Sequence, residues 1–246
     1  MKLYALIGHP LKHSLSRDLF TNKFKQEGLD YRFQNYDIQQ VERIIDIIAE
    51  HPELCGFNVT IPYKESIIPL LDEIDPTAKE IGAVNTVKVE NGKTKGYNTD
   101  IYGFEQLLSR AVNGKKIDHA LILGTGGASK AVQHVLKQKG IAYSMVSRSA
   151  EKGDFTYETL TDEILCQNHL IINTTPLGMA PKFDDFPDLH YQALSNKHIL
   201  IDLIYNPKVT AFMELGKTWG AKVYGGMQMF EEQAKKTWEI FNHDEK

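Results

Sequence analysis

A glycine-rich turn near the middle of the chain constrains the fold more than any other feature. The run Gly124-Thr125-Gly126-Gly127-Ala128-Ser129 directly follows the apolar segment 120–123 and opens an amphipathic segment of helix length. A buried strand, a glycine turn and a helix in this order form the nucleotide loop of dinucleotide-binding folds. Gly124 permits the tight turn, Gly126 lets the backbone approach a pyrophosphate, and the helix N-terminus attracts the anion. A structural turn without a ligand is the alternative interpretation.

Short apolar runs and amphipathic segments alternate along the rest of the chain. Strands are predicted at 3–7, 31–36, 56–60, 120–123, 143–146, 170–173 and 199–203. Helices are predicted at 15–27, 41–49, 67–71, 100–112 and 229–241, and one more runs from the glycine-rich turn to 139–140. Asn91-Gly92 predicts a hairpin turn between 83–89 and 94–97. This alternation predicts an α/β protein whose second half is a parallel sheet with helices on both faces. A boundary near residue 100 separates two α/β units.

Composition excludes several classes of protein. The 246 residues include 28 Lys and Arg against 32 Asp and Glu, giving a net charge of −4. Nucleic acid is therefore not the expected main partner, and no apolar run is long enough to span a membrane. Cys55 and Cys166 form no disulfide framework, which indicates a reducing, cytoplasmic setting. The histidines lack the spacing of metal ligands, so we expect no metal site.

The residues after the second strand of the nucleotide unit indicate which nicotinamide cofactor is bound. In NAD-binding proteins an acidic residue there binds the ribose 2′-hydroxyl. Here the strand ends in Ser147-Arg148-Ser149, and Lys152 follows. Cationic groups and hydroxyls can hold a 2′-phosphate, which an acidic residue would repel. The sequence therefore favours NADP(H), with an exposed arginine on an ordinary loop as the alternative.

Polar residues gather at the ends of predicted strands in the first half. Ser14 and Ser16 precede a helix and could hold a carboxylate, although one serine could simply be an N-cap. Lys64 follows a strand and a proline, a position that is usually on the surface. Asn85 and Asp100 follow in similar settings, and Asp100 alone could be a helix N-cap.

Taken together, these motifs resemble the shikimate dehydrogenase family over nearly the whole chain. The resemblance rests on Gly8-x-Pro10-x-x-His13-Ser14-x-Ser16, Asn58-Val59-Thr60-x-Pro62-x-Lys64, Gly82-Ala83-Val84-Asn85-Thr86, Gly96-x-Asn98-Thr99-Asp100, Gly124-x-Gly126-Gly127-Ala128, Asn173-Thr174-Thr175-Pro176-x-Gly178-Met179, Asp202-x-x-Tyr205 and Gly226-Met227-x-Met229 through Gln233. Each motif is short, but so many in the family's order do not arise by accident.

The resemblance implies a substrate-binding catalytic domain over residues 1–100, completed by a C-terminal helix at about 226–246. It implies an NADP-binding Rossmann-like domain over residues 101–225, with the active site in the cleft between the domains. The implied reaction is the reversible reduction of 3-dehydroshikimate to shikimate by NADPH, in aromatic amino acid (chorismate) biosynthesis. The implied substrate residues are Ser14, Ser16, Thr60, Asn85, Asp100, Tyr205 and Gln233. The implied cofactor residues are Gly124, Gly126, Gly127, Ala128, Ser147, Arg148, Ser149, Lys152, Thr174, Leu203, Gly226 and Met229.

The implied chemistry explains a lysine together with an aspartate. Reduction of a carbonyl builds negative charge on its oxygen, which needs a positive donor and then a proton. We take Lys64 as the acid/base and Asp100 as its partner, although the sequence leaves open which of them carries the proton.

Three departures from the family's pattern bear on specificity. Arg17 stands where the family usually has proline, and Ser147 stands where NADP-using members usually have asparagine. The short stretch between Ser147 and Asn173 predicts a trimmed domain that lacks a helix or a strand on its adenine side. Alternatives are a quinate/shikimate dehydrogenase of dual NAD/NADP specificity, an aminoshikimate dehydrogenase and a non-catalytic ligand sensor. Monomer and homodimer both remain open.

Overall fold

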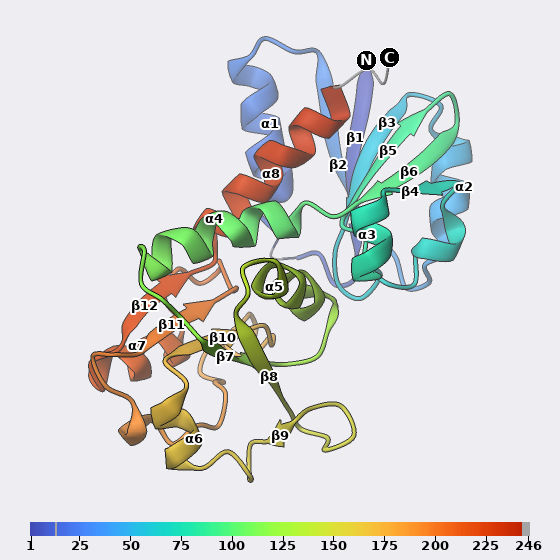
Figure 1. The fold of residues 1–246 in the computed structure, drawn as a ribbon. Helices are drawn as coiled ribbons and strands as arrows, with labels where there is room; N and C mark the ends of the chain where they lie inside the picture. Colours follow the sequence, from blue (N-terminus) through green and yellow to red (C-terminus); the bar gives the residue numbers. More distant parts are fainter. Residues whose placement is uncertain (13, 243–246) are drawn as a thin grey trace. The chain divides into compact units, whose positions relative to one another are not determined.

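The buried apolar run at the N-terminus forms strand β1 (Lys2–Gly8), an inner strand of a six-stranded sheet (Figure 1). The sheet order is β2-β1-β3-β5-β6-β4, and β2 and β3 both pair with β1 in parallel. The antiparallel hairpin of β5 and β6 turns at Asn91 and Gly92, which both have positive φ, as the sequence predicts. The other strands are β2 (Tyr31–Asp37), β3 (Leu54–Val59), β4 (Glu73–Ile74), β5 (Thr86–Glu90) and β6 (Lys93–Tyr97).

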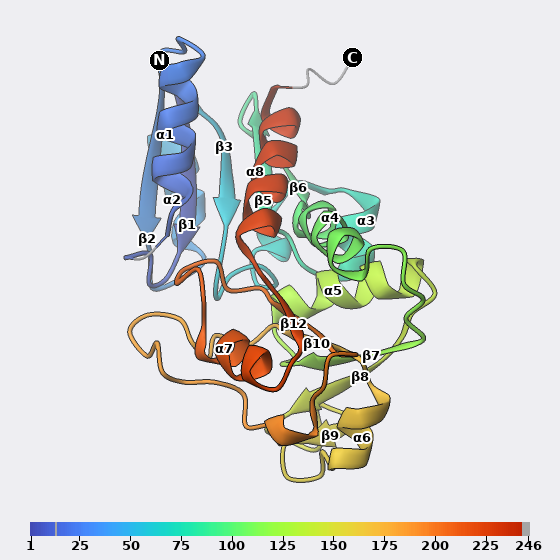
Figure 2. The same cartoon turned by 90° about the vertical axis from the view of Figure 1, so that its left-hand side faces the viewer.

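Helices α1 (Ser16–Gln26) and α8 (Met227–Asn242) lie over one face of this sheet (Figure 2), and an aromatic cluster packs there. Phe20 and Phe24 of α1 pack there with Tyr4 of β1 and Phe33 of β2. Phe241, near the end of α8, stacks on Tyr4 with ring centroids 4.9 Å apart. The C-terminal helix is therefore part of the core that the N-terminal strand begins.

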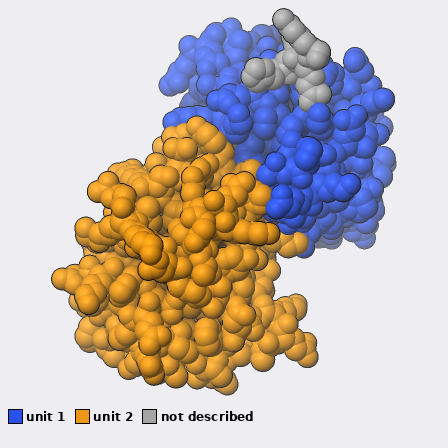
Figure 3. All heavy atoms as spheres, in the orientation of Figure 1, with its two compact units in different colours: residues 1–99, 234–246 blue, residues 100–233 orange. Residues whose placement is uncertain are grey.

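The chain divides into two compact units (Figure 3), and α8 contributes residues to both. The structure, a computed structural model, describes residues 1–12 and 14–242. Unit 1 contains residues 1–99 and 234–246, and unit 2 contains residues 100–233. The end of the predicted C-terminal segment, 243–246, and His13 lie outside the described residues.

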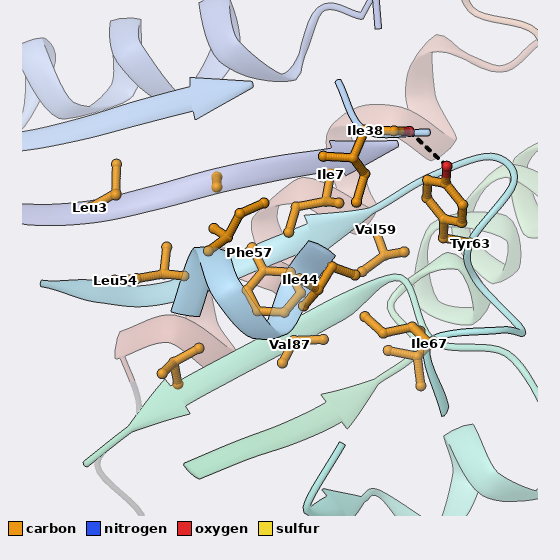
Figure 4. Close-up of a cluster of buried hydrophobic side chains, with 14 of the residues drawn as sticks. Leu3, Ile7, Ile38, Ile44, Leu54, Phe57, Val59, Tyr63, Ile67 and Val87 are labelled. Atoms are coloured by element: carbon orange, nitrogen blue, oxygen red, sulfur yellow. Dashed lines mark hydrogen bonds between the residues drawn. The ribbon is translucent and has the colours of Figure 1, made fainter. Parts of the chain in front are cut away.

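An aliphatic core covers the opposite face of the first sheet (Figure 4). Ile7 of β1 and Val59 of β3 pack there against Ile44 of α2 (Arg43–Glu50). The Tyr63 hydroxyl lies at the rim of this core and donates a hydrogen bond to the Ile38 carbonyl at 2.7 Å. The remaining helices of unit 1 are the single 3₁₀ turn η1 (Ile68–Leu70) and α3 (Pro76–Ile81).

Unit 2 is a parallel sheet in the order β12-β11-β10-β7-β8-β9. This is the order of a doubly wound Rossmann fold, and it confirms the predicted fold class. The strands are β7 (His119–Leu123), β8 (Ala142–Ser147), β9 (Phe155–Thr156), β10 (Leu170–Asn173), β11 (Ile199–Asp202) and β12 (Lys222–Gly225). Helices α4 (Asp100–Val112) and α5 (Gly127–Gln138) cover one face, and α6 (Asp162–Gln167), η2 (Tyr191–Ala193) and α7 (Ala211–Thr218) cover the other.

Of the two losses that the sequence offers between Ser147 and Asn173, a helix or a strand, the structure lacks the helix and keeps the strand. No helix connects β8 to β9 across residues 148–154. The strand survives as the two residues Phe155–Thr156, and α6 follows it. Among the described residues, no helix is long and apolar enough to cross a membrane.

Candidate active site

The predicted substrate residues of unit 1 gather at one edge of its sheet. Strands β1 and β3 run in parallel, so their carboxyl ends, Gly8 and Val59, lie at the same edge. Strand β5 is antiparallel to β3 and begins at that edge, where Asn58 pairs with Thr86. The residues that follow β1, follow β3, precede β5 and follow β6 are therefore neighbours. These connections carry Ser14, Ser16, Thr60, Lys64, Asn85 and Thr99.

Ser14 and Ser16 form a local hydrogen-bonded turn before α1. The Ser14 hydroxyl accepts a hydrogen bond from the Ser16 N–H at 3.3 Å and donates to the Ser16 hydroxyl at 3.4 Å. The N-cap position itself is Leu15, whose side chain makes no cap. The alternative that a serine occupies the N-cap is therefore wrong. Arg17 is exposed on the first turn of α1.

The segment after β3 is held rigidly by backbone hydrogen bonds. The Thr60 N–H donates to the Ile7 carbonyl at 2.9 Å, and the Val84 N–H donates to the Lys64 carbonyl at 2.7 Å. A side chain at Gly8 would place its Cβ 2.4 Å from Cγ2 of Thr60, so only glycine lets the two segments approach. The half-buried Lys64 side chain thus extends from a backbone fixed on both sides.

Asn85 is held by a buried polar network. Its Oδ1 accepts hydrogen bonds from the Thr99 N–H at 2.7 Å and from the Thr86 hydroxyl at 3.2 Å, and its Nδ2 donates to the Thr99 hydroxyl at 3.0 Å. Thr237 of α8 completes the network, with its hydroxyl 2.9 Å from that of Thr86 and 3.1 Å from that of Thr99. Asn58 also donates to Thr237. Thr237 stands in none of the motifs quoted from the sequence, although a threonine on the buried stripe of α8 is a detectable signal.

Asp100 begins α4 and is only 6% exposed. On the same face of α4, a Cβ at Gly103 would lie 2.5 Å from the Met229 carbonyl and 3.1 Å from Cβ of Gln233. The missing side chain at Gly103 therefore lets α4 and α8 approach closely, with Asp100 and Gln233 on the facing sides.

Tyr205 belongs to the same part of unit 2. Its ring stacks on Phe230 of α8 with centroids 4.4 Å apart. Gln233 donates from Nε2 to the Phe230 carbonyl at 3.0 Å. The predicted residues Tyr205 and Gln233 therefore meet around one residue of α8.

The predicted cofactor residues of unit 2 lie at the carboxyl edge of its sheet, where β7 and β10 mark the reversal of strand order. Gly124 has φ +101°, and a side chain there would contact the Thr174 hydroxyl at 3.0 Å. The Thr174 hydroxyl donates to the Leu123 carbonyl at 2.7 Å. Gly124 and Thr174 therefore form the junction between the two halves of the sheet.

The start of α5 offers an open position for an anion. Gly126 is the N-cap residue and has no side chain to cap the helix, while Gly127 and Ala128 form its first turn. A Cβ on Gly126 would have no atom within 4 Å, so space remains directly over the helix N-terminus. Ser129 is fully buried and donates its hydroxyl to the Gly126 carbonyl at 2.6 Å. The loop therefore fits a pyrophosphate, with Ser129 closing the turn where the usual pattern has glycine or alanine.

The remaining predicted cofactor residues come from the β11 and β12 side of the sheet. They are Leu203 after β11, Gly226 after β12 and Met229 in α8. A Cβ at Gly226 would sit 2.1 Å from the Leu203 carbonyl oxygen, so this contact requires glycine. The Leu203 N–H donates to the Asn173 carbonyl at 3.0 Å, and Met229 is buried in the first turn of α8.

Asp202 and Asn173 pair at the ends of β11 and β10, next to these residues. In the sequence they stand out only as parts of motifs. Burial raises the pKa of Asp202 to about 6, and hydrogen bonds from Thr210, Ile204 and Asn173 oppose that rise. The Thr210 hydroxyl donates at 2.6 Å, the Ile204 N–H at 3.1 Å and Asn173 at 3.1 Å. Asp202 thereby fixes the turn between β11 and Tyr205.

At the end of β8, Ser147 is buried, and its hydroxyl accepts a hydrogen bond from the Ser149 N–H at 3.2 Å. Arg148 and Lys152 are exposed. Within the described ranges, no group of three or more His, Cys, Asp or Glu side chains could hold a metal ion. A mixed α/β unit joined to a Rossmann-type nucleotide unit defines the chain as a two-unit protein of the dinucleotide-binding class.

Comparisons with known proteins place the chain within that class. The model of the shikimate dehydrogenase substrate binding domain matches residues 6–87. A shikimate dehydrogenase (NADP(+)) of Clostridium beijerinckii is 40% identical and covers 98% of this chain and 92% of its own length. The chain belongs to the shikimate dehydrogenase family.

Solved structures agree over the whole chain. Shikimate dehydrogenase from Aquifex aeolicus superposes with a TM-score of 0.86 at 35% identity, covering 100% of this chain and 94% of its own. The shikimate 5-dehydrogenase of Thermus thermophilus, solved with NADP(H) and shikimate, has a TM-score of 0.84 at 29% identity, covering 98% and 94%.

Proposed function

We propose that this chain is an NADP-dependent shikimate dehydrogenase, which reversibly reduces 3-dehydroshikimate to shikimate in aromatic amino acid biosynthesis. The observation that carries the proposal is the arrangement of polar side chains at a single edge of each sheet. In unit 1 that edge carries the two serines, Lys64 and Asn85, and in unit 2 it carries an open glycine loop. The family's NADP-dependent members supply the reaction class.

Unit 1, with its C-terminal helix, is the proposed substrate-binding part, and unit 2 is the proposed NADP-binding part. Gly124, Gly126, Gly127 and Ala128 would receive the pyrophosphate, because the helix start above them is open and lacks a capping side chain. Ser147, Arg148, Ser149 and Lys152 would receive the 2′-phosphate. Thr174, Leu203, Gly226 and Met229 would border the nicotinamide end. When bound, NADPH supplies the hydride for the carbonyl carbon.

In unit 1, Ser14 and Ser16 would bind the substrate carboxylate through hydroxyls already turned toward each other. Thr60 and Asn85 would bind ring hydroxyls, and the Thr99 and Thr86 contacts hold the Asn85 amide in one orientation. Tyr205 and Gln233 are the remaining proposed ring contacts. A fixed orientation matters because the reaction is faster when the enzyme holds the substrate in the productive geometry.

Lys64 is the proposed acid/base. Its ammonium would stabilise the negative charge that develops on the carbonyl oxygen and then give that oxygen a proton. Asp100 would orient the ammonium or accept a substrate hydroxyl. The fixed backbone of Lys64 supports this role because the ammonium must reach one atom reproducibly.

An initial-rate assay of reduced nicotinamide absorbance tests the proposal. Shikimate and quinate are each combined with NADP⁺ and NAD⁺, for the wild type, Lys64→Ala and the exposed control Lys25→Ala. We expect turnover with shikimate and NADP⁺, a loss of about 10²–10⁴-fold in Lys64→Ala and none in Lys25→Ala. Near-normal turnover of Lys64→Ala would remove Lys64 from the mechanism.

Comparable rates with quinate or NAD⁺ would assign the protein to a dual-specificity dehydrogenase. Ser147, in place of the family's usual asparagine, is the feature that favours this second candidate. Absence of turnover with every pair would contradict both candidates. Both cysteines are free thiols, which supports a cytoplasmic setting for the reaction.

A further inference from the structure

The connection between β8 and β9 is unusually short for two parallel strands. Val146 pairs with Phe155 and Ser147 with Thr156, so only residues 148–154 return the chain to the starting end of the neighbouring strand (Figure 1). Parallel neighbours normally need a crossover of about a dozen residues or more, usually containing a helix. A connection without a helix must be held by other contacts.

Asp154 supplies those contacts at the far end of the connection. Its N–H donates to the Met145 carbonyl at 2.8 Å, and its Oδ2 accepts the Met145 N–H at 2.7 Å. Together the two bonds tie residue 154 to both backbone groups of one residue of β8. The carboxylate thus satisfies a strand N–H that a longer neighbouring strand would otherwise bind.

Gly153 brings the connection into contact with β8. A Cβ there would lie 2.9 Å from the Met145 carbonyl oxygen, 2.9 Å from Cβ of Ser147 and 3.0 Å from the Ser147 nitrogen. Two of these three neighbours are backbone atoms of β8, an inner strand, and cannot move aside easily. Two further bonds close the turn, from the Ser149 N–H to the Ser147 hydroxyl at 3.2 Å and from the Lys152 N–H to the Ser149 carbonyl at 3.1 Å.

The connection between β8 and β9 carries two cationic side chains, Arg148 and Lys152, and starts beside the glycine loop. Arg148 and Lys152 are exposed, and neither forms an ion pair with another residue of 1–12 or 14–242. The Gly124 N–H donates to the Val146 carbonyl at 2.9 Å, so the glycine loop begins beside the end of β8.

We propose that Asp154 is a positioning residue for cofactor choice. By tying residues 148–153 to β8, it holds Arg148 and Lys152 where they receive the 2′-phosphate of NADP. The inference rests on the proposed function, because it deepens the NADP site of that enzyme. Asp154 acts through its hydrogen bond to Met145, since its negative charge by itself would repel a phosphate. The hydrogen bond should therefore strengthen NADP binding and the charge should weaken it. Variants that remove one or both can separate the two effects.

Calorimetric titration of wild type and variants with NADP⁺ and with NAD⁺ tests the inference. Asp154→Ala removes both bond and charge, and we expect NADP⁺ binding to weaken roughly five- to twentyfold while NAD⁺ binding changes less than about twofold. Asp154→Asn keeps an oxygen acceptor for the Met145 N–H without the charge, so it should bind NADP⁺ as tightly as the wild type or more tightly. Glu158→Ala removes a nearby exposed carboxylate and controls for charge alone.

A double-mutant cycle shows whether Asp154 acts through Arg148. In an Arg148→Ala background, Asp154→Ala should weaken NADP⁺ binding by much less than it does alone. Equal weakening of NADP⁺ and NAD⁺, an Asp154→Asn variant as weak as Asp154→Ala, or additive effects in the cycle would each overturn the inference.

The assay of shikimate oxidation by the wild type is a separate measurement. Its failure would contradict the proposed function, whereas the ratio of the two binding constants would still decide the role of Asp154.

Discussion

At the scale of single residues, the glycines at the carboxyl edge of the second sheet exclude side chains for two different reasons. Gly226 is required by the protein itself, since a Cβ would overlap the Leu203 carbonyl. Gly126 has open space where its Cβ would be and an ordinary backbone conformation, as φ is −84°. Nothing in the fold therefore requires glycine at position 126. The absence of a side chain there fits the proposed pyrophosphate site.

Gly126→Ala should accordingly separate binding from folding. We expect a change of less than about 1 kcal/mol in the free energy of unfolding, because alanine fits without strain and only the N-cap preference is lost. NADP⁺ binding should weaken at least about tenfold, because the methyl group occupies the approach to the helix N-terminus. Thermal unfolding and titration with NADP⁺ check the two halves of this expectation. Unchanged affinity would contradict the placement of the pyrophosphate.

Asp202 leads to a prediction about pH. Burial raises its pKa from 3.8 to about 6. Between pH 3.8 and about 6, the folded protein therefore holds a proton that the unfolded chain has lost. The wild type should therefore lose stability relative to Asp202→Asn as the pH rises from about 4 to about 6. The loss should reach up to about 3 kcal/mol and remain constant at higher pH. Urea unfolding of both proteins at several pH values measures the difference. A difference independent of pH would show that the native carboxylate is not penalised.

At the scale of secondary structure, the sequence predicts elements with strong periodicity well. Helix α4 spans Asp100–Val112, as predicted, because Asn113 and Gly114 adopt positive φ and end it. Strands β4 and β9 are missed, since two residues carry no alternation. Edge strand β12 is missed as well, because its Lys222 is exposed and its other residues are only partly buried.

The candidate site residues also divide into those that a local sequence pattern predicts and those that it does not. Ser14, Lys64 and Asp100 stand in recognisable motifs, so the sequence predicts them. Thr237 and Asp154 act through contacts with residues far along the chain or with backbone atoms, which no local pattern reveals. Their importance becomes visible only when the fold is known.

The network at Thr237 gives a prediction for α8 as an element. Thr237→Val keeps the shape of the side chain but leaves the Thr86, Thr99 and Asn58 groups without this partner. We expect the free energy of unfolding to fall by about 1–3 kcal/mol, and Thr237→Ser to restore part of it. Thr218→Val on the exposed end of α7 is the matched control and should change little. Chemical denaturation compares them, and equal effects at 237 and 218 would contradict the network's importance.

At the scale of the whole molecule, unit 2 is inserted within the sequence of unit 1. Removing residues 234–246 should therefore damage the part of the protein at the opposite end of the sequence. The truncated chain would lose Phe241, which stacks on Tyr4, and Trp238, whose ring lies 5.3 Å from that of Phe24. We expect unit 1 to bind hydrophobic dyes and to be cleaved rapidly by proteases, while unit 2 resists. Protease resistance of residues 1–99 in the truncated chain would contradict this expectation.

The same insertion sets the order in which a ribosome can complete the protein. The first 99 residues emerge early, yet the aromatic face of their sheet is covered only by α1 until the end of α8 is made. At about 5–20 residues per second, synthesis of the inserted unit takes roughly 7 to 27 seconds. During that interval Tyr4, Phe20 and Phe24 lack their contacts with Trp238 and Phe241. The half that emerges first is thus the half whose core is completed last.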